Sequence, residues 1–242
     1  MEKLSQIYEG KAKILFQTSN QNQLIQFFKD DATAFNAQKK AIIDGKGVLN
    51  NYISEFIMIE LEKNSIPTHF IQRINNREQL VKKVKIIPLE VIVRNIVAGS
   101  MAKRLGINEG DELSEPVFEI CYKKDELHDP IINDDHATIV LKLINKNQLS
   151  ELKNLSLKIN QILTKIFNEI SIKLVDFKIE FGFDNESNSI ILADEISPDS
   201  CRLWDKDTLK KLDKDRFRRD LGGLTEAYQE VARRLKISIN NL

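Results

Sequence analysis

Hydrophobic and charged residues alternate most regularly over residues 174–182, LVDFKIEFG. Side chains of a β-strand point to opposite faces in turn, so the aromatic and aliphatic residues would face a core. The other face would then carry the charged side chains of Asp176, Lys178 and Glu180. A surface strand with a solvated polar face produces the same alternation. The pattern therefore predicts a strand with one apolar face and leaves open what meets the charged face.

A second strand-like run, SIILADEI (189–196), follows the turn-forming residues DNESN, and the two runs are expected to form a hairpin. Folded symmetrically about Ser187, the hairpin places Glu180 opposite Asp194 on one face, about 5 Å apart. Two like charges at this spacing destabilise a sheet unless a cation lies between them. Because carboxylate ligands without nearby His or Cys suit a hard ion, we expect Glu180 and Asp194 to bind magnesium.

The remaining hydrophobic pattern predicts further strands and several helices. Strands are expected over 6–17, 23–35, 68–74 and 78–95, and helices over 48–63, 99–105, 147–171, 214–221 and 224–235. Pro88 would mark a boundary or a bend, and Gly106 would end the helix before it. The apolar repeat of residues 147–171 fits core packing better than a cofactor site. This order of elements predicts an α+β fold with a smaller N-terminal lobe (1–85) and a larger domain (86–242), hinged near residues 82–88.

Composition restricts the possible partners and the location of the protein. The 242 residues contain 36 basic and 36 acidic side chains, and this balance disfavours general nucleic-acid binding. Cys121 and Cys201 have no metal-ligand spacing, so we expect both thiols to be reduced and structural. The first ten residues lack an apolar signal core, and no apolar run approaches the length of a membrane span. We therefore expect a cytoplasmic protein with neither nucleic acid nor membrane as a partner.

The segment YEGKAKILF (8–16) places Gly10 between two strands and is followed by Lys11 and Lys13. It has too few glycines for a Walker A loop or a dinucleotide fingerprint. A glycine turn that lets the backbone approach a phosphate, together with two ammonium groups, could cover a nucleotide. An ordinary hairpin with solvated lysines is the commoner origin of such a pattern.

The segment IIPLEVIVRNIVAGS (86–100) joins an apolar strand that ends near Arg94 to a helix that opens at Gly99 and Ser100. The free N–H groups of a helix start suit an anion, and Arg can clamp a phosphate or carboxylate with two hydrogen bonds. An Arg paired with a nearby carboxylate and Ser100 as a simple N-cap would explain the same residues.

Two loops add further candidates. Arg202, in SPDSCRLWD, could bind another part of an anionic ligand. Asp129, in HDP, could face a cleft, although an Asp before Pro is more often a turn former.

Eight segments resemble, in order, the phosphoribosylaminoimidazole-succinocarboxamide synthase (SAICAR synthetase) family. They extend from residue 8 to residue 223: YEGKAK, GKGVLNN, IIPLEVIVRNIVAGS, KRLGI, HDP, LVDFKIEFG, DEISPDSCRLWD and KDRFRRDLGG. The resemblance implies a two-lobed fold related to ATP-grasp enzymes, with ATP bound between an N-terminal sheet and a larger C-terminal domain. Asn36 departs from the pattern, since several members of the family have Asp there.

The resemblance also implies a role for each matching residue. The ATP-binding residues would be Gly10, Lys11, Ala12, Lys13, Leu15, Lys82, Val84, Glu180 and Asp194. Glu180 and Asp194 would hold magnesium, and Arg94, Ser100 and Arg202 would bind the phosphate of the ribotide substrate. The reacting centre would contain Asp176, Lys178, Asp129 and Asp199.

The family reaction joins the carboxylate of carboxyaminoimidazole ribotide (CAIR) to the amino group of L-aspartate at the expense of ATP, and the resemblance implies a homodimer. A small-molecule kinase acting on a hydroxyl of a phosphorylated substrate could use the same lysines and carboxylates. A nucleotide-binding module without catalysis is a third reading. The absence of an HRD-type catalytic base in the sequence argues against the kinase.

Overall fold

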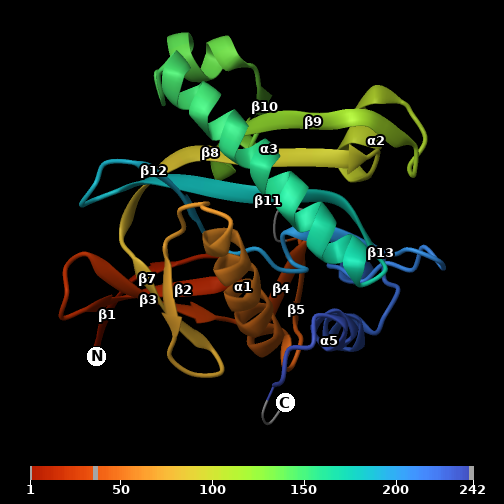
Figure 1. The fold of residues 1–242 in the computed structure, drawn as a ribbon, viewed down its shortest axis with the longest axis horizontal. Helices are drawn as coiled ribbons and strands as arrows, with labels where there is room; N and C mark the ends of the chain where they lie inside the picture. The colour runs from red at the N-terminus through yellow and green to blue at the C-terminus, as the bar shows by residue number, and fades with distance from the viewer. Residues whose placement is uncertain (1, 35–37, 240–242) are drawn as a thin grey trace.

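The computed structural model describes residues 2–34 and 38–239 and contains two antiparallel sheets (Figure 1). The predicted departure at Asn36 lies outside the described residues. The first sheet has the strand order β1 (Lys3–Glu9), β2 (Lys13–Thr18), β3 (Gln23–Phe28), β7 (Glu78–Lys82) and β6 (Phe70–Arg73). A separate ribbon pairs β4 (Asp31–Ala34) with β5 (Lys39–Ile42).

The second sheet carries the longest strands. Its order is β10 (Ile131–Ile132), β9 (Glu112–Tyr122), β8 (Val84–Ile96), β11 (Ile172–Asp184) and β12 (Ile190–Ala193), and β13 (Cys201–Asp205) also pairs with β11. A single residue, Lys83, separates β7 of the first sheet from β8 of the second. Pro88 does not end β8, but the pairing with β11 shifts beside it, so Pro88 lies in a bulge.

In the described part of the chain, five α-helices cover and connect the sheets: α1 (Lys46–Lys63), α2 (Gly99–Leu105), α3 (Lys146–Glu169), α4 (Asp215–Arg218) and α5 (Leu224–Arg234). A 3₁₀ turn (Asp125–Leu127) and a π-helical turn (His136–Val140) lie between β9 and α3. Gly106 ends α2 in the left-handed conformation, as predicted. The predicted helix over 214–221 is shorter because Asp220, Gly222 and Gly223 all adopt positive φ angles.

Helix α3 crosses the face of β8 and β11 (Figure 1). It begins with a capping box, in which Asn145 accepts from the Gln148 backbone and Gln148 accepts from the Asn145 backbone. Its apolar stripe is buried, as the core-packing interpretation expected. The same continuous hydrophobic core includes Ile53 of α1, Phe177 of β11 and Tyr228 of α5. This core therefore joins α1 and α5 to the second sheet, and it reaches the first sheet at Phe70 of β6.

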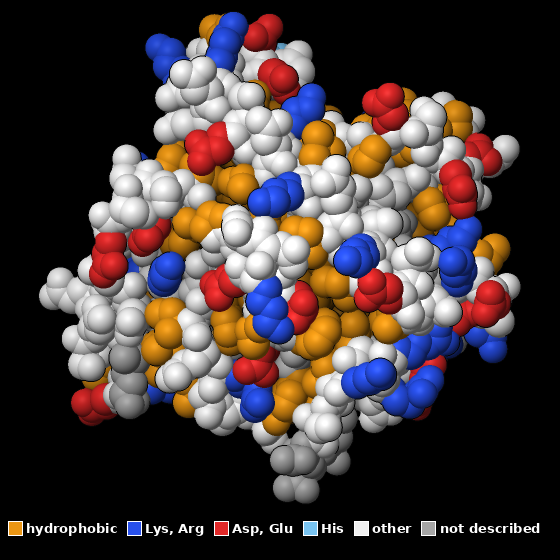
Figure 2. Space-filling view, viewed as in Figure 1, with side chains coloured by type: hydrophobic (Ala, Val, Ile, Leu, Met, Phe, Trp, Pro, Cys, Tyr) orange, Lys and Arg blue, Asp and Glu red, His pale blue; other side chains and the backbone are white. Residues whose placement is uncertain are grey.

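The predicted α+β architecture is confirmed by the two sheets and their helices. Strands β9 and β13 were not anticipated, and both pair with the central strands of the second sheet. Both cysteines are free and buried, as expected. On the face shown in Figure 2, acidic and basic side chains are interspersed over most of the surface. Within residues 2–34 and 38–239, no helix is both long enough and apolar enough to cross a membrane.

Candidate active site

A cavity of about 1020 Å³ is lined by residues from both sheets. Most of the residues singled out in the sequence line it: Gly10, Lys11, Ala12, Lys13, Leu15, Lys82, Val84, Asp129, Lys178, Glu180, Asp194 and Asp199. Four others, Arg94, Ser100, Asp176 and Arg202, do not line it and form a second network of polar contacts. The folded chain thus brings together the glycine turn and the charged hairpin, which are far apart in sequence.

Part of the charged face of β11 turns toward this cavity. Phe177, Ile179 and Phe181 are buried in the core, and Lys178 and Glu180 line the cavity on the opposite face. The predicted hairpin register was wrong by one residue, because Glu180 pairs with Ala193 rather than Asp194. The turn centres between Glu186 and Ser187 instead of on Ser187, as the pairing of Phe183 with Ile190 requires.

Asp194 nevertheless approaches Glu180, for a different reason. It is the first residue after β12 and has a φ of 62°, so its side chain leaves the alternation of the strand. Burial and the nearby Asp194 charge raise the pKa of Glu180, against the lowering effect of Lys123. Burial also favours the neutral form of Asp194, but Lys13, Lys178 and Lys123 lower the pKa of Asp194 overall. The charge of Asp194 thus acts on Glu180, and three lysines act on Asp194.

Each of these carboxylates has a lysine partner in the structure. Lys13 donates to Asp194 and lies 3.0 Å from Glu195 Oε1, and Lys123 Nζ lies 2.5 Å from Glu180 Oε2. Lys178 Nζ donates to Glu90 Oε1 at 2.6 Å. The cavity wall is therefore a set of alternating positive and negative charges.

Three further charged residues line the cavity and were not among those predicted from the sequence: Glu90, Lys123 and Glu195. Glu90 had a usable signal, because it lies on the same face of β8 as Arg94, four residues away. Lys123 had none, because it stands beside Lys124 and only the fold determines which of the two lysines lines the cavity. Glu195 follows Asp194, and both line the cavity.

Asp199 lies at another part of the cavity wall and is held on both oxygens. Lys46 Nζ donates to its Oδ2 at 2.7 Å, and the Tyr228 hydroxyl donates to its Oδ1 at 2.6 Å. Lys214 Nζ lies 3.6 Å from the same Oδ2. Although burial favours the neutral acid, Lys214 and Lys46 lower the pKa of Asp199 well below its ordinary value. A carboxylate held in this way is a poor proton acceptor.

The cavity mouth contains Lys11 and Asp129. Lys11 Nζ donates to Asp125 Oδ1 at 3.0 Å, which links the β1–β2 turn to the 3₁₀ turn after β9. Asp129 has a φ of 48° and accepts a hydrogen bond from the Lys124 backbone N–H at 2.8 Å. Asp129 therefore acts as a turn former and also lines the cavity.

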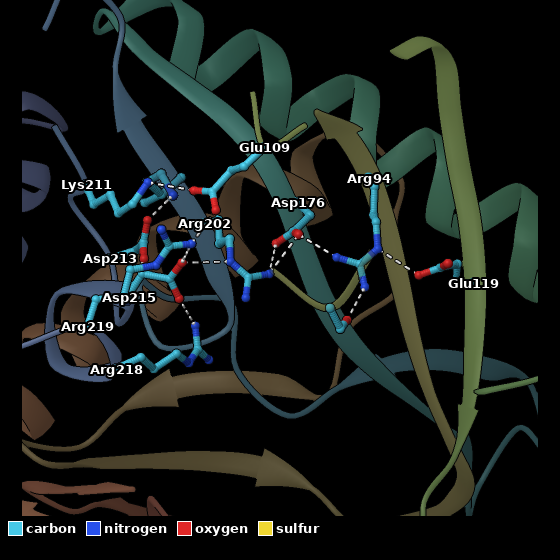
Figure 3. A network of polar contacts seen from close by, with 12 residues as sticks. Arg94, Glu109, Glu119, Asp176, Arg202, Lys211, Asp213, Asp215, Arg218 and Arg219 are labelled. Atoms are coloured by element: carbon cyan, nitrogen blue, oxygen red, sulfur yellow. Dashed lines mark hydrogen bonds and ion pairs between the residues drawn. The ribbon is translucent and has the colours of Figure 1, made fainter. Parts of the chain in front are cut away.

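Asp176 lies at the centre of a separate network of buried ions (Figure 3). It pairs in register with Arg94 of β8 on one side and Arg202 of β13 on the other. Arg94 Nη1 donates to Asp176 Oδ2 at 2.7 Å, and Arg202 Nη1 donates to the same oxygen at 2.8 Å. Two guanidinium groups thus share one carboxylate across three neighbouring strands.

Arg94 is only 1% exposed and donates to three partners. Besides Asp176, it donates to Glu119 at 2.7 Å and to the Ser100 hydroxyl at 3.2 Å. This is the carboxylate-paired arrangement considered above, and the substrate contact of Arg94 stays a prediction. Ser100 is not the N-cap, because α2 begins at Gly99 and is preceded by Ala98.

Arg202 lies against the backbone of Gly99. Its Nε donates to Asp215 Oδ2 at 3.0 Å, and a Cβ atom on Gly99 would lie 2.4 Å from its Nη2. Gly99 also has a φ of 55°, a conformation that side chains rarely adopt. The position of this guanidinium therefore depends on a glycine at residue 99.

We expect Gly99→Ala to lower the free energy of unfolding by about 2–4 kcal/mol, from left-handed strain plus the clash with Arg202. Gly106→Ala is the matched control: its φ is 65°, but nothing lies within 4 Å of the added Cβ. Strain alone should cost the control about 1 kcal/mol. Urea unfolding of both variants measures the difference, and equal losses would contradict the close contact.

The α+β fold with lysines and carboxylates arranged between two sheets is of the kind that a nucleotide-dependent enzyme needs. The family model described as SAICAR synthetase matches residues 6–235. The chain belongs to the SAICAR synthetase family.

Individual relatives are similar to this chain along almost its whole length. Phosphoribosylaminoimidazole-succinocarboxamide synthase from Sinorhizobium fredii is 57% identical over 243 residues, which cover 100% of this chain and 95% of that protein. The crystal structure of the synthase from Ehrlichia chaffeensis has a TM-score of 0.95 at 52% identity and covers 98% of this chain and 100% of that one. A SAICAR synthetase in complex with ADP has a TM-score of 0.93 at 47% identity, covering 97% and 99%. The resemblance seen in the sequence is confirmed.

Proposed function

We propose that the protein is an ATP-dependent carbon–nitrogen ligase of purine biosynthesis that joins CAIR to L-aspartate and releases SAICAR, ADP and phosphate. The observation that carries this proposal is the cavity in which Lys13, Asp194 and Glu180 meet between two sheets, in a chain of this family. The related synthetase in complex with ADP supports nucleotide binding by this chain.

The N-terminal lobe (1–85) would cover the nucleotide. The Gly10 turn brings backbone N–H groups and Lys13 to the cavity wall, where a polyphosphate could lie. Lys82 and Val84 line the same cavity beside Leu15 and would contact the adenine. Residues 86–242 would supply the ribotide and amino-acid sites.

Glu180 and Asp194 fit magnesium, because this ion takes one or two protein carboxylates and completes its coordination with water and phosphate oxygens. Within the described part of the chain, no group of three or more His, Cys, Asp or Glu side chains is arranged to hold a metal. The pair would therefore need oxygens from the nucleotide. The bound ion would supply neutralisation of the charge on the transferring phosphoryl group.

The chemistry follows from the inertness of a carboxylate toward an amine. A carboxylate oxygen of CAIR attacks the γ-phosphorus of ATP, the bond to ADP breaks, and an acyl phosphate forms. The amine of L-aspartate then attacks the acyl carbon, phosphate leaves, and the amine loses a proton. Lys13 and Lys178 would stabilise the negative charge on the reacting groups, so catalysis is mainly positioning and electrostatic stabilisation.

Arg202 and Ser100 would bind the ribotide phosphate, with Arg94 and Asp176 fixing their positions. The Ser100 hydroxyl accepts from Arg94 and keeps its own hydrogen for a ligand. Asp176 would orient the ribotide through the two arginines that share it.

The decisive experiment measures ADP release with magnesium-ATP while CAIR and L-aspartate are omitted in turn. We expect release to need both, with a product heavier than CAIR by the condensed aspartate. Release that needs only a hydroxyl-bearing phosphorylated compound would favour a kinase, and ATP binding without turnover would favour a binding module. The proposal includes a homodimer in the cytoplasm, and sedimentation of the purified protein tests the oligomeric state.

A further inference from the structure

Two buried lysines share a single carboxylate at one part of the cavity wall. The side chains of Lys46, Lys214 and Asp199 are 1%, 11% and 4% exposed. Both Asp199 oxygens are occupied, Oδ2 by Lys46 at 2.7 Å and Oδ1 by the Tyr228 hydroxyl at 2.6 Å. Lys214 Nζ, at 3.6 Å, lies beyond hydrogen-bond distance of Asp199.

This arrangement leaves one positive charge uncompensated. The other acid that acts on Lys214 electrostatically is Glu195, but Glu195 already accepts from Ser197 at 2.6 Å and pairs with Lys13 at 3.0 Å. Arg218 adds a further positive charge nearby. Burial lowers the pKa of Lys214, as expected for an ammonium group removed from water. A buried charge without a full partner is costly, and an anionic ligand in the cavity would supply the partner.

The location of Lys214 indicates which anion it would meet. The backbone N–H of Lys214 donates to the carbonyl oxygen of Pro198 at 3.1 Å. Two residues after Pro198, the carbonyl oxygen of Ser200 accepts from the backbone N–H of Lys178 at 2.8 Å. Lys214 therefore lies beside the part of β11 that carries Lys178, on the cavity wall with Asp199. The polyphosphate already has Lys13 and the Gly10 turn, and the ribotide phosphate has Arg202. The dicarboxylic amino acid needs a cation of its own, and Lys214 is a buried lysine of the cavity wall whose Nζ has no partner within hydrogen-bond distance.

We propose that Lys214 binds a carboxylate of the amino-acid substrate, with Asp199 fixed beside it by Lys46 and Tyr228. A lysine suits this task as a compact point charge with three donors. Lys46 and Tyr228 are positioning residues, since they act through Asp199. The inference rests on the proposed ligase function and adds to it the site of the amine donor.

The test compares Lys214→Met with Lys214→Arg and with a surface control, Lys210→Met, which changes an exposed lysine of the preceding loop. We expect Lys214→Met to raise KM for L-aspartate at least about tenfold, the loss typical of a hydrogen bond to a charged group. KM for ATP and for CAIR should change little. Lys214→Arg should recover part of the affinity, and Lys210→Met should behave as the unaltered protein.

Thermal unfolding without substrates separates binding from a structural role. Removing an uncompensated buried charge should raise the unfolding temperature of Lys214→Met, whereas breaking a needed ion pair would lower it. A variant that fails to fold, or that unfolds at lower temperature with unchanged KM for L-aspartate, overturns the inference. If the unaltered protein releases no ADP with all substrates present, the proposed function itself fails. If the unaltered protein is active and Lys214→Met has an unchanged KM for L-aspartate, only the inference is contradicted.

Discussion

Asp194→Asn is expected to reduce ADP release about a hundredfold or more while the fold stays intact. Asn has nearly the same shape as Asp and tolerates the left-handed conformation that Asp194 adopts. We therefore expect the backbone conformation to stay unchanged. The substitution removes a charge that would help to hold magnesium and that now pairs with Lys13. Electrostatic stabilisation of a transferring phosphoryl group by such a site amounts to several kcal/mol. Steady-state ADP release at saturating substrates measures the change.

The control for this prediction is Glu186→Gln in the turn of the same hairpin. Glu186 is exposed, accepts from Asn22 and does not line the cavity. Its neutralisation should leave ADP release unchanged. A rate for Asp194→Asn close to that of the control, in a variant that unfolds normally, would show that phosphoryl transfer does not need this carboxylate.

Arg94→Met is expected to lower the free energy of unfolding by about 3 kcal/mol, the low end of the range for breaking a buried ion pair. The low end applies because each acid that loses Arg94 keeps one other arginine: Asp176 keeps Arg202, and Glu119 keeps Arg104. The methionine fills much of the volume, so the loss reports mainly on charge and hydrogen bonds. Urea unfolding measures it.

Arg104→Met provides a matched comparison, because Arg104 pairs with the same Glu119 from the surface and its side chain is 37% exposed. An exposed ion pair contributes less than about 1 kcal/mol. Similar losses in the two variants would mean that the burial of Arg94 adds nothing to the strength of its ion pairs.

The local pattern of the sequence was sufficient to predict the central strand β11 and the orientation of its side chains. The alternation in residues 174–182 predicted the faces of β11 correctly, because one face is core and a period of two leaves no other arrangement. The same pattern could not fix the hairpin register, which depends on where the turn centres. Nor could the pattern predict the position of the Asp194 side chain. Asp194 approaches Glu180 because its φ is positive after the end of the strand, and hydrophobic periodicity carries no information about that angle.

The residues that complete the cavity come from distant parts of the chain. Lys46 begins α1, Tyr228 lies in α5, and both meet Asp199 only after these elements pack together. A short apolar or polar pattern carries no information about such contacts. Glu90 is the exception, because it alternates with the buried residues of β8 and so lies on the same strand face as Arg94. This signal was present in the sequence.

The contacts of helix α1 with both sheets have a consequence for how the cleft is maintained. Helix α1 packs against strands of the first sheet and against α5, and its buried side chains belong to the same core as those of β8 and β11. Heat or denaturant that loosens either sheet removes the support of the other, so the wall that carries Lys13 and the wall that carries Glu180 should be lost in one cooperative step. A half-molecule cut at Lys83 would retain neither wall.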